Sequence, residues 1–246
     1  MGPNIPDKPV PREIRALLSD ERPILRETQR AVTPFGGVAV FLSFIDKISL
    51  VEKVRQHMPI HWRSPNHIDP TAILTAFLMA VLVGVRRWAH ASLLRGDRAL
   101  HALLGLERFP TDGTIRNLFR AFGMGDVQRL YEPLAEWQMQ RVPPRGADGF
   151  CLKQSGATEA AFRAVLLLFN LRSEFQRAAG LPGYRAPATI RTQVFTCGAI
   201  LGRAGRRLVI HLSGSWGGLK SRIPMLDSML ACEIPTSPKL APAAGT

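Results

Sequence analysis

Cysteine is scarce in this sequence, because 246 residues contain only three, which lie far apart: Cys151, Cys197 and Cys232. No two of them have the paired spacing of a metal site or a disulfide framework, so a reducing cytoplasm is the simplest compartment. The N-terminal stretch has no apolar signal core, which argues against secretion. The strongest apolar run, residues 72–85, is shorter than the roughly 20 residues of a membrane-spanning helix. We therefore expect a cytoplasmic protein.

Acidic residues are also few, with 19 Asp and Glu against 32 Lys and Arg, which gives a net charge of +13. Such an excess points to a polyanionic partner, most simply nucleic acid, and membrane-surface binding is the alternative. The hydrophobic content of 46% is enough to bury a core in one large domain or two small ones.

Residues 1–33 combine several prolines with alternating charges, which disfavours a continuous helix and predicts an extended basic arm. This arm has four arginines that can reach phosphates: Arg12, Arg15, Arg26 and Arg30. A solvated tail is the favoured alternative, since chain ends often behave in this way.

Helical periodicity begins after this arm and predicts an amphipathic helix over residues 37–48. The loop that follows, residues 57–67, contains three histidines, but no cysteine or paired carboxylate joins them at ligand spacing, so we interpret them as surface residues. Asp69 and Pro70 then predict the start of a helix over residues 71–85 that is apolar nearly all round and belongs at the centre of a bundle.

The sharpest local pattern lies in residues 109–123, where Ile115, Leu118, Phe119 and Phe122 recur at helical spacing behind a cap at Thr111 or Asp112. A preceding helix over residues 89–104 and a short polar turn complete the layout of a DNA-reading helix-turn-helix. An ordinary solvated helix is the alternative, and the positive charge of the chain favours DNA. The candidate DNA-binding residues are Arg86, Arg87, Arg95, Arg98, Arg116, Asn117 and Arg120.

The sequence pattern changes at residues 142–150, which we name the junction. A helix over residues 126–140 is expected before it, with Pro133 kinking or restarting the helix. After it we expect a helix over residues 158–179, strands over 189–201 and 206–213 with residues 202–205 between them, and a weakly packed tail. Its mostly buried residues should be Phe162, Val165, Leu166, Phe169 and Leu171. The predicted fold is mainly α: an N-terminal helical bundle with a helix-turn-helix-like element, then a long helix and a C-terminal β-hairpin.

Segments on both sides of the junction resemble bacterial insertion-sequence transposases, whose RNase-H-like core carries two Asp and one Glu. The resemblance implies a DNA-binding domain at 34–145 and a remnant of the catalytic region at 146–246. The segments before the junction are TPFGGVAVFLSFIDKISLVEKV, DPTAILTAFLMAVLVGVRRWAH and RFPTDGTIRNLFRAFGMGDVQRLYEPLAEWQMQRVPPR. Those after it are DGFCLKQSGATEAAFRAVLLLFNL, LPGYRAPATIRTQVFTCGAILGRAGRRLVIHLS and SWGGLKSRIPMLDSML.

The resemblance also implies a deletion, because family members are longer and their three acids would fall at the junction. No catalytic or metal-binding residue is therefore carried over, and no cofactor is expected here, although intact relatives use Mg²⁺. In relatives we expect a pair of bulky aromatic residues at the position of Ser155-Gly156 and an apolar residue at the position of Arg172. A charge in place of a core residue destabilises the fold, unless Arg172 reaches outward to solvent. We interpret the remaining acids as cap or turn residues (Asp97, Asp112, Asp126 and Asp148) and as helix-surface charges (Glu159 and Glu174).

These observations predict a transposase-family protein that binds insertion-sequence terminal repeats without cutting or joining strands, alone, as a homo-oligomer or with an intact transposase. One alternative is a decayed product with exposed hydrophobic surface and no function. The other is residual metal-dependent strand cleavage and transfer by the remaining acids.

Overall fold

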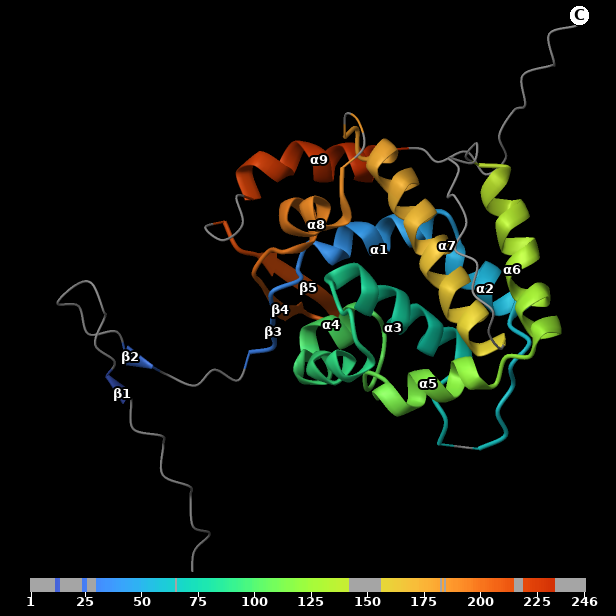
Figure 1. The fold of residues 1–246 in the computed structure, drawn as a ribbon. Helices are drawn as coiled ribbons and strands as arrows, with labels where there is room; N and C mark the ends of the chain where they lie inside the picture. The colour runs from blue at the N-terminus through green and yellow to red at the C-terminus, as the bar shows by residue number, and fades with distance from the viewer. Residues whose placement is uncertain are drawn as a thin grey trace, which may run out of the picture.

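The computed structural model describes residues 12–13, 24–25, 30–64, 66–141, 156–181, 183, 185–214 and 219–232. The fold is mainly helical with a small sheet late in the chain, which confirms the predicted fold class (Figure 1). Most of the junction, with Asp148, Cys151 and Ser155, lies outside the described residues. The helices are α1 (Val38–Lys47), α2 (Leu50–His57), α3 (Pro70–Val83), η1 (Trp88–Gly96), α4 (Arg98–Leu103), α5 (Asp112–Arg120), α6 (Met124–Met139), α7 (Gly156–Ala178), α8 (Pro187–Ile190), η2 (Arg191–Phe195) and α9 (Leu219–Ala231).

Helix α3 lies at the centre of the bundle, as its apolar sequence predicts. Asp69 caps it by accepting a hydrogen bond from the Ala72 amide at 3.1 Å, and Pro70 occupies its first turn. The helix packs against α2, α5, α7 and η1, so nearly all of its side chains are buried. Within the described ranges no single helix is both long and apolar enough to span a membrane. Together α3 and η1 reach that length, but a bend of 94° separates them.

Phenylalanine rings from both sides of the junction meet in one core. Phe41 of α1 lies 5.3 Å from Phe175 of α7 and 5.7 Å from Phe195 of η2, measured between ring centroids, with near-perpendicular planes. All three side chains are fully buried. Edge-to-face pairs of this kind add to the stabilisation from buried area. The described segments before and after the junction are therefore packed into one hydrophobic cluster.

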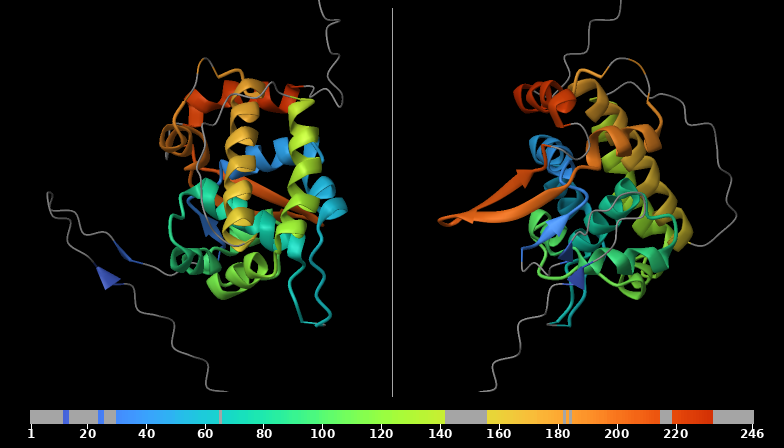
Figure 2. Two further views of the ribbon diagram at one scale, coloured as in Figure 1. Left: turned by 45° about the vertical axis from the view of Figure 1, so that its right-hand side comes forward. Right: turned by 90° about the vertical axis from the view of Figure 1, so that its left-hand side faces the viewer.

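Helices α6 and α7 lie side by side and run parallel (Figures 1 and 2). The Tyr131 hydroxyl donates to the Ala160 carbonyl at 2.8 Å, and further along Arg141 Nε donates to Glu174 Oε1 at 3.0 Å. The end of α6 therefore lies beside the C-terminal half of α7.

Burial of Tyr131 raises the pKa of its phenol well above the usual value of about 10. A raised acid pKa means that the stability it contributes is present below the unfolded pKa and is lost as pH rises above it. We expect the advantage of the wild type over Tyr131→Phe, about 1 kcal/mol from the hydrogen bond at pH 8, to disappear by about pH 11. Urea unfolding of both proteins from pH 8 to 11 checks this. Both proteins contain Tyr184, the other tyrosine, so its ionisation affects them equally. A constant difference would contradict it.

The predicted buried face of α7 is wrong. The buried stripe consists of Ala160, Ala164, Leu167, Leu168, Leu171 and Phe175, which recur at helical spacing and face α3, α5 and α6. Of the residues predicted to be buried, only Leu171 belongs to this stripe, whereas Val165 and Phe169 are 40% and 36% exposed. The larger apolar side chains Val165 and Phe169 lie outside this stripe and are therefore partly exposed.

The predicted strand at 189–201 is wrong over most of its length, since residues 187–195 are helical. Pro187 in the first turn starts α8, and η2 continues it so that Ile190, Val194 and Phe195 enter the core. Burial of these three side chains outweighs their β propensity. The hairpin itself is confirmed as strands β4 (Ala199–Ala204) and β5 (Arg207–Leu212), and its turn lies at residues 205–206 rather than 202–205.

Two other helical predictions also change. The single helix expected over 89–104 is divided into η1 and α4, because Asp97 ends the first and caps the second through the Leu100 amide at 2.8 Å. Helix α6 continues through Pro133, so of the two expected effects of this proline the new helix start does not occur. In the tail, α9 packs on α1, where Lys47 Nζ donates to the Cys232 carbonyl at 2.7 Å and Met229 is fully buried. The tail is therefore packed over 219–232 instead of weakly attached.

Candidate nucleic-acid interface

Helix α5 has the two faces that its sequence predicts. Thr111 caps it by accepting a hydrogen bond from the Thr114 amide at 3.0 Å. Ile115, Leu118 and Phe119 are buried against α3, η1 and α7, so the opposite face is turned to solvent. The three polar residues predicted for this face are all exposed, namely Arg116, Asn117 and Arg120.

Arg116 differs from the other two because it has a partner one turn earlier. It donates a hydrogen bond to the Asp112 carboxylate, and this bond holds the pKa of Asp112 below its usual range. Both groups are partly exposed, at 46% and 32% of their side-chain areas. The Asp112 carboxylate offsets the charge of Arg116 at neutral pH, whereas Asn117 and Arg120 form no ion pair with another described residue.

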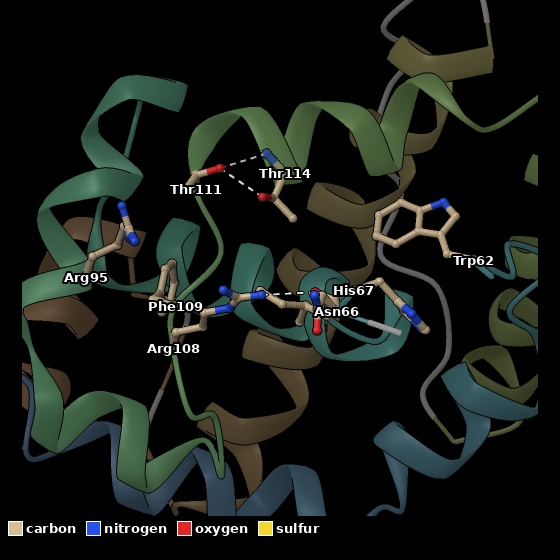
Figure 3. A pocket seen from close by; sticks show the side chains of 9 residues that line it. Trp62, Asn66, His67, Arg95, Arg108, Phe109, Thr111 and Thr114 are labelled. Carbon is tan, nitrogen blue, oxygen red and sulfur yellow. Dashed lines mark hydrogen bonds between the residues drawn. The ribbon is translucent and has the colours of Figure 1, made fainter. Parts of the chain in front are cut away.

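The loop between α2 and α3 contributes Trp62, Asn66, His67 and Ile68 to one wall of a cavity of about 240 Å³ beside the start of α5. Trp62 and His67 from the loop, Arg95 from η1, and Thr111 and Thr114 from α5 line it (Figure 3). Arg108 fixes the loop by donating to the Asn66 carbonyl at 3.0 Å. The cavity thus brings together aromatic, hydroxyl, imidazole and guanidinium groups from three separate segments.

Two further cavities adjoin this one through shared residues. One, of about 340 Å³, shares Trp62, His67 and Thr114 and adds Asn117. The other, of about 640 Å³, shares Arg95 and Arg108 and adds Arg98 from α4. We name the combined surface the α5 groove and define it by these residues: Trp62, His67, Arg95, Arg98, Arg108, Thr114 and Asn117.

The chemistry of the α5 groove suits a nucleic acid. Arg95, Arg98 and Arg108 can neutralise phosphates, and none of them forms an ion pair with another described residue. Asn117 carries both the donor and the acceptor that pair with an adenine edge. Trp62 supplies a ring on which a base can stack. One acid, Glu107, lines the end of the groove near Arg98.

Two of the predicted DNA-binding residues lie apart from this groove. Arg86 and Arg87 line a different cavity, of about 360 Å³, together with Trp88 and the α7 residues Phe162 and Val165. Arg191 lies close enough to Arg86 to be affected by its charge. Burial is the main cause that lowers the pKa of the Arg191 guanidinium, and the positive charge of Arg86 lowers it further. The Arg191 Nε donates to the Leu82 carbonyl at 3.2 Å. The predicted arginines therefore form two separate cationic regions, and Arg120 of α5 lines neither cavity group.

Trp62, Asn66 and Arg108 were not identified from the sequence, and His67 was interpreted only as a surface histidine. The signal in the sequence that could have identified this surface is a tryptophan, Trp62, among polar loop residues. Arg108 was hidden in the connection between α4 and α5, which covers residues 104–111 and is longer than the 3–4 residues of a typical helix-turn-helix turn. The longer connection is what brings Arg108 to the loop.

Most acids in the described ranges have structural roles, as predicted. Asp97 caps α4, Asp126 accepts from the Gly123 amide at 3.0 Å at the start of α6, and Glu159 accepts from Arg163 at 2.6 Å on α7. Within these ranges no three side chains among His, Cys, Asp and Glu gather closely enough to hold a metal ion.

Glu174 is an exception, because the prediction that it is a helix-surface charge is wrong. It is 7% exposed and binds Arg141, since this turn of α7 faces the end of α6. Arg172 is buried as well, at 5% exposure, with its guanidinium 4.7 Å from the centroid of the Phe169 ring. It does not reach outward to solvent.

Comparisons with protein families, curated proteins and solved structures find no match to this chain. The transposase resemblance is therefore carried by the sequence segments alone.

Proposed function

We propose that the chain binds duplex DNA through the α5 groove. The observation that carries this proposal is a set of adjoining cavities, two of them lined by α5 residues. Together they hold three arginines without ion-pair partners among the described residues, one exposed asparagine and one tryptophan. Phosphate contacts from the arginines supply affinity and orientation, and Asn117 contacts a base edge. The net charge of +13 draws the chain to DNA from a distance.

The resemblance to insertion-sequence transposases gives this binding a biological context. The DNA would be the terminal repeats of an insertion sequence, bound in the cytoplasm by a protein that does not cut them. A partner chain, either a second copy or an intact transposase, would join it on the same DNA. Support for an inactive role comes from Asp97, Asp112 and Asp126, whose carboxylates already cap helices or pair with arginine.

Titration of a labelled duplex of about 30 base pairs, roughly three helical turns, tests the proposal. We expect the logarithm of the binding constant to fall with the logarithm of salt concentration, with a slope of about −3 or steeper between roughly 50 and 200 mM salt. Vesicles of anionic phospholipid serve as the control polyanion. Salt-insensitive or absent DNA binding, or equal binding to the vesicles, would overturn the proposal.

A further inference from the structure

The β4–β5 hairpin extends away from the helices, as the right-hand view of Figure 2 shows. Its strands pair over their full length, from Ala199 opposite Leu212 to Ala204 opposite Arg207. A third strand, β3 (Val32–Thr33), pairs only with Ala199 and Ile200 at the base. Beyond this base the hairpin is a two-stranded ribbon with solvent on both faces.

The turn of the hairpin is tight and places an arginine at the tip. Gly205, the first of the two turn residues, has φ +61°, a conformation that glycine adopts without strain and that a type II′ turn requires there. The second turn residue is Arg206, which is exposed. The tip therefore exposes the Arg206 guanidinium, because the other turn residue, Gly205, has no side chain.

Arginines also lie on both faces of the ribbon. Cross-strand partners share a face and successive residues alternate, so Arg203 lies on the face of Leu208 and Arg207 lies on the face of Ala204. The two faces are opposite. Arg203, Arg206 and Arg207 are all exposed, and none of them forms an ion pair with another described residue.

The base of the hairpin is held rigidly against the helices that carry the α5 groove. Thr33 of β3 donates a hydrogen bond to Asp97 at 2.6 Å, and Asp97 caps α4, which carries Arg98. At the other edge, a Cβ added to Gly36 would lie 2.5 Å from Ala199 Cβ and 2.8 Å from Leu212, so the chain before α1 packs tightly on the ribbon base. The hairpin and the groove therefore belong to one packed unit.

We propose that the β4–β5 hairpin is a second DNA-contacting element, which inserts its tip into a groove of the duplex held by the α5 groove. The major groove, about 12 Å wide, admits a two-stranded ribbon. Inside it, phosphates line both walls, which matches the arginines on both faces of the ribbon, and base edges form the floor, which the arginine at the tip can contact. This inference rests on the proposed function, since it adds a contact to the same duplex.

The test compares two triple variants of the full chain in the duplex titration. The first is Arg203→Ala, Arg206→Ala and Arg207→Ala, and the second removes the same charge from exposed helical sites through Arg55→Ala, Arg129→Ala and Arg177→Ala. The hairpin variant is expected to bind about tenfold more weakly at roughly 0.15 M salt, with a salt slope reduced by about 1–2. The helical variant should change the slope by less than about 1, and a lysine version of the hairpin variant should retain the wild-type slope.

The outcomes separate this inference from the proposed function. If the wild type binds duplex DNA and the hairpin variant binds with the same slope, the hairpin inference is overturned and the α5 groove proposal stands. If the wild type does not bind duplex DNA, both are overturned. If the lysine version loses the slope as the alanine version does, charge is not the cause and the hairpin inference is overturned. Loss of vesicle binding instead of DNA binding also overturns it.

Discussion

Glu174→Gln is expected to lower the free energy of unfolding by about 3–5 kcal/mol, the largest effect on stability that we predict for a single substitution. Glu174 and Arg141 are ion-paired at 9% and 5% side-chain exposure, and Arg141 also lies 5.1 Å from the centroid of the Trp137 ring. Removing the carboxylate charge leaves the arginine buried without compensation. Chemical denaturation of both proteins at neutral pH measures the difference.

A double variant distinguishes the loss of a buried pair from a general packing defect. In Arg141→Met with Glu174→Met both charges are removed, and apolar pairs of similar volume often match the stability of the ion pair that they replace. We expect the double variant to recover most of the stability lost by Glu174→Gln. Arg163→Ala is the matched control, because its pair with Glu159 is 35% and 25% exposed and should cost about 1 kcal/mol or less. A double variant that is less stable than Glu174→Gln would contradict this reading of the pair.

Elements whose structural causes lie within their own sequence segment were predictable. Helix α3 combines a cap, a proline in the first turn and apolar residues throughout, and helix α5 combines a threonine cap with a clear stripe. In both cases the sequence contains all of the physical causes of the structure. The hairpin was predictable for the same reason, since Gly205 supplies the turn and β-branched residues follow it.

Features that depend on distant partners were not predictable. Helix α7 has apolar residues on two faces, and only the positions of α3, α5 and α6 decide that Leu167 and Phe175 are buried while Phe169 is partly exposed. Glu174 was interpreted as a surface charge because nothing local shows that Arg141 lies opposite it. These are long-range packing effects, to which periodicity within one segment is insensitive.

The candidate interface shows the same division. The exposure of Asn117 followed from the stripe of α5, whereas the positions of Arg86 and Arg95 in different cavities depend on which distant segments pack beside each of them. Trp62 and Arg108 belong to irregular segments, whose positions are set by contacts such as the bond from Arg108 to the Asn66 carbonyl. Binding residues in loops are therefore the ones that the sequence identifies least well.

Replacing Arg95, Arg98 and Arg108 with alanine is expected to weaken duplex binding about 100-fold at roughly 0.15 M salt and to reduce the salt slope by about 2–3. Each arginine lines the α5 groove and has no acidic partner among the described residues, so each loss removes a phosphate contact and its released counterion. Arg55→Ala, Arg129→Ala and Arg177→Ala again supply the control of equal charge. The affinity of Arg108→Ala alone is also measured, because this substitution removes the hydrogen bond to the Asn66 carbonyl that fixes the loop, besides removing a charge.

Combining the groove and hairpin substitutions decides whether the two surfaces hold the same duplex. If both contact it at once, their reductions in salt slope add, because each group of arginines releases its own counterions. If they compete for the same phosphates, the combined variant resembles the groove variant alone. An unchanged affinity in the groove variant would contradict the α5 groove as the binding surface, and a loss equal to that of the control would assign the effect to net charge.

The asparagine gives an independent readout: Asn117→Ala should weaken binding to a preferred sequence by about 1–3 kcal/mol and leave random-sequence binding almost unchanged.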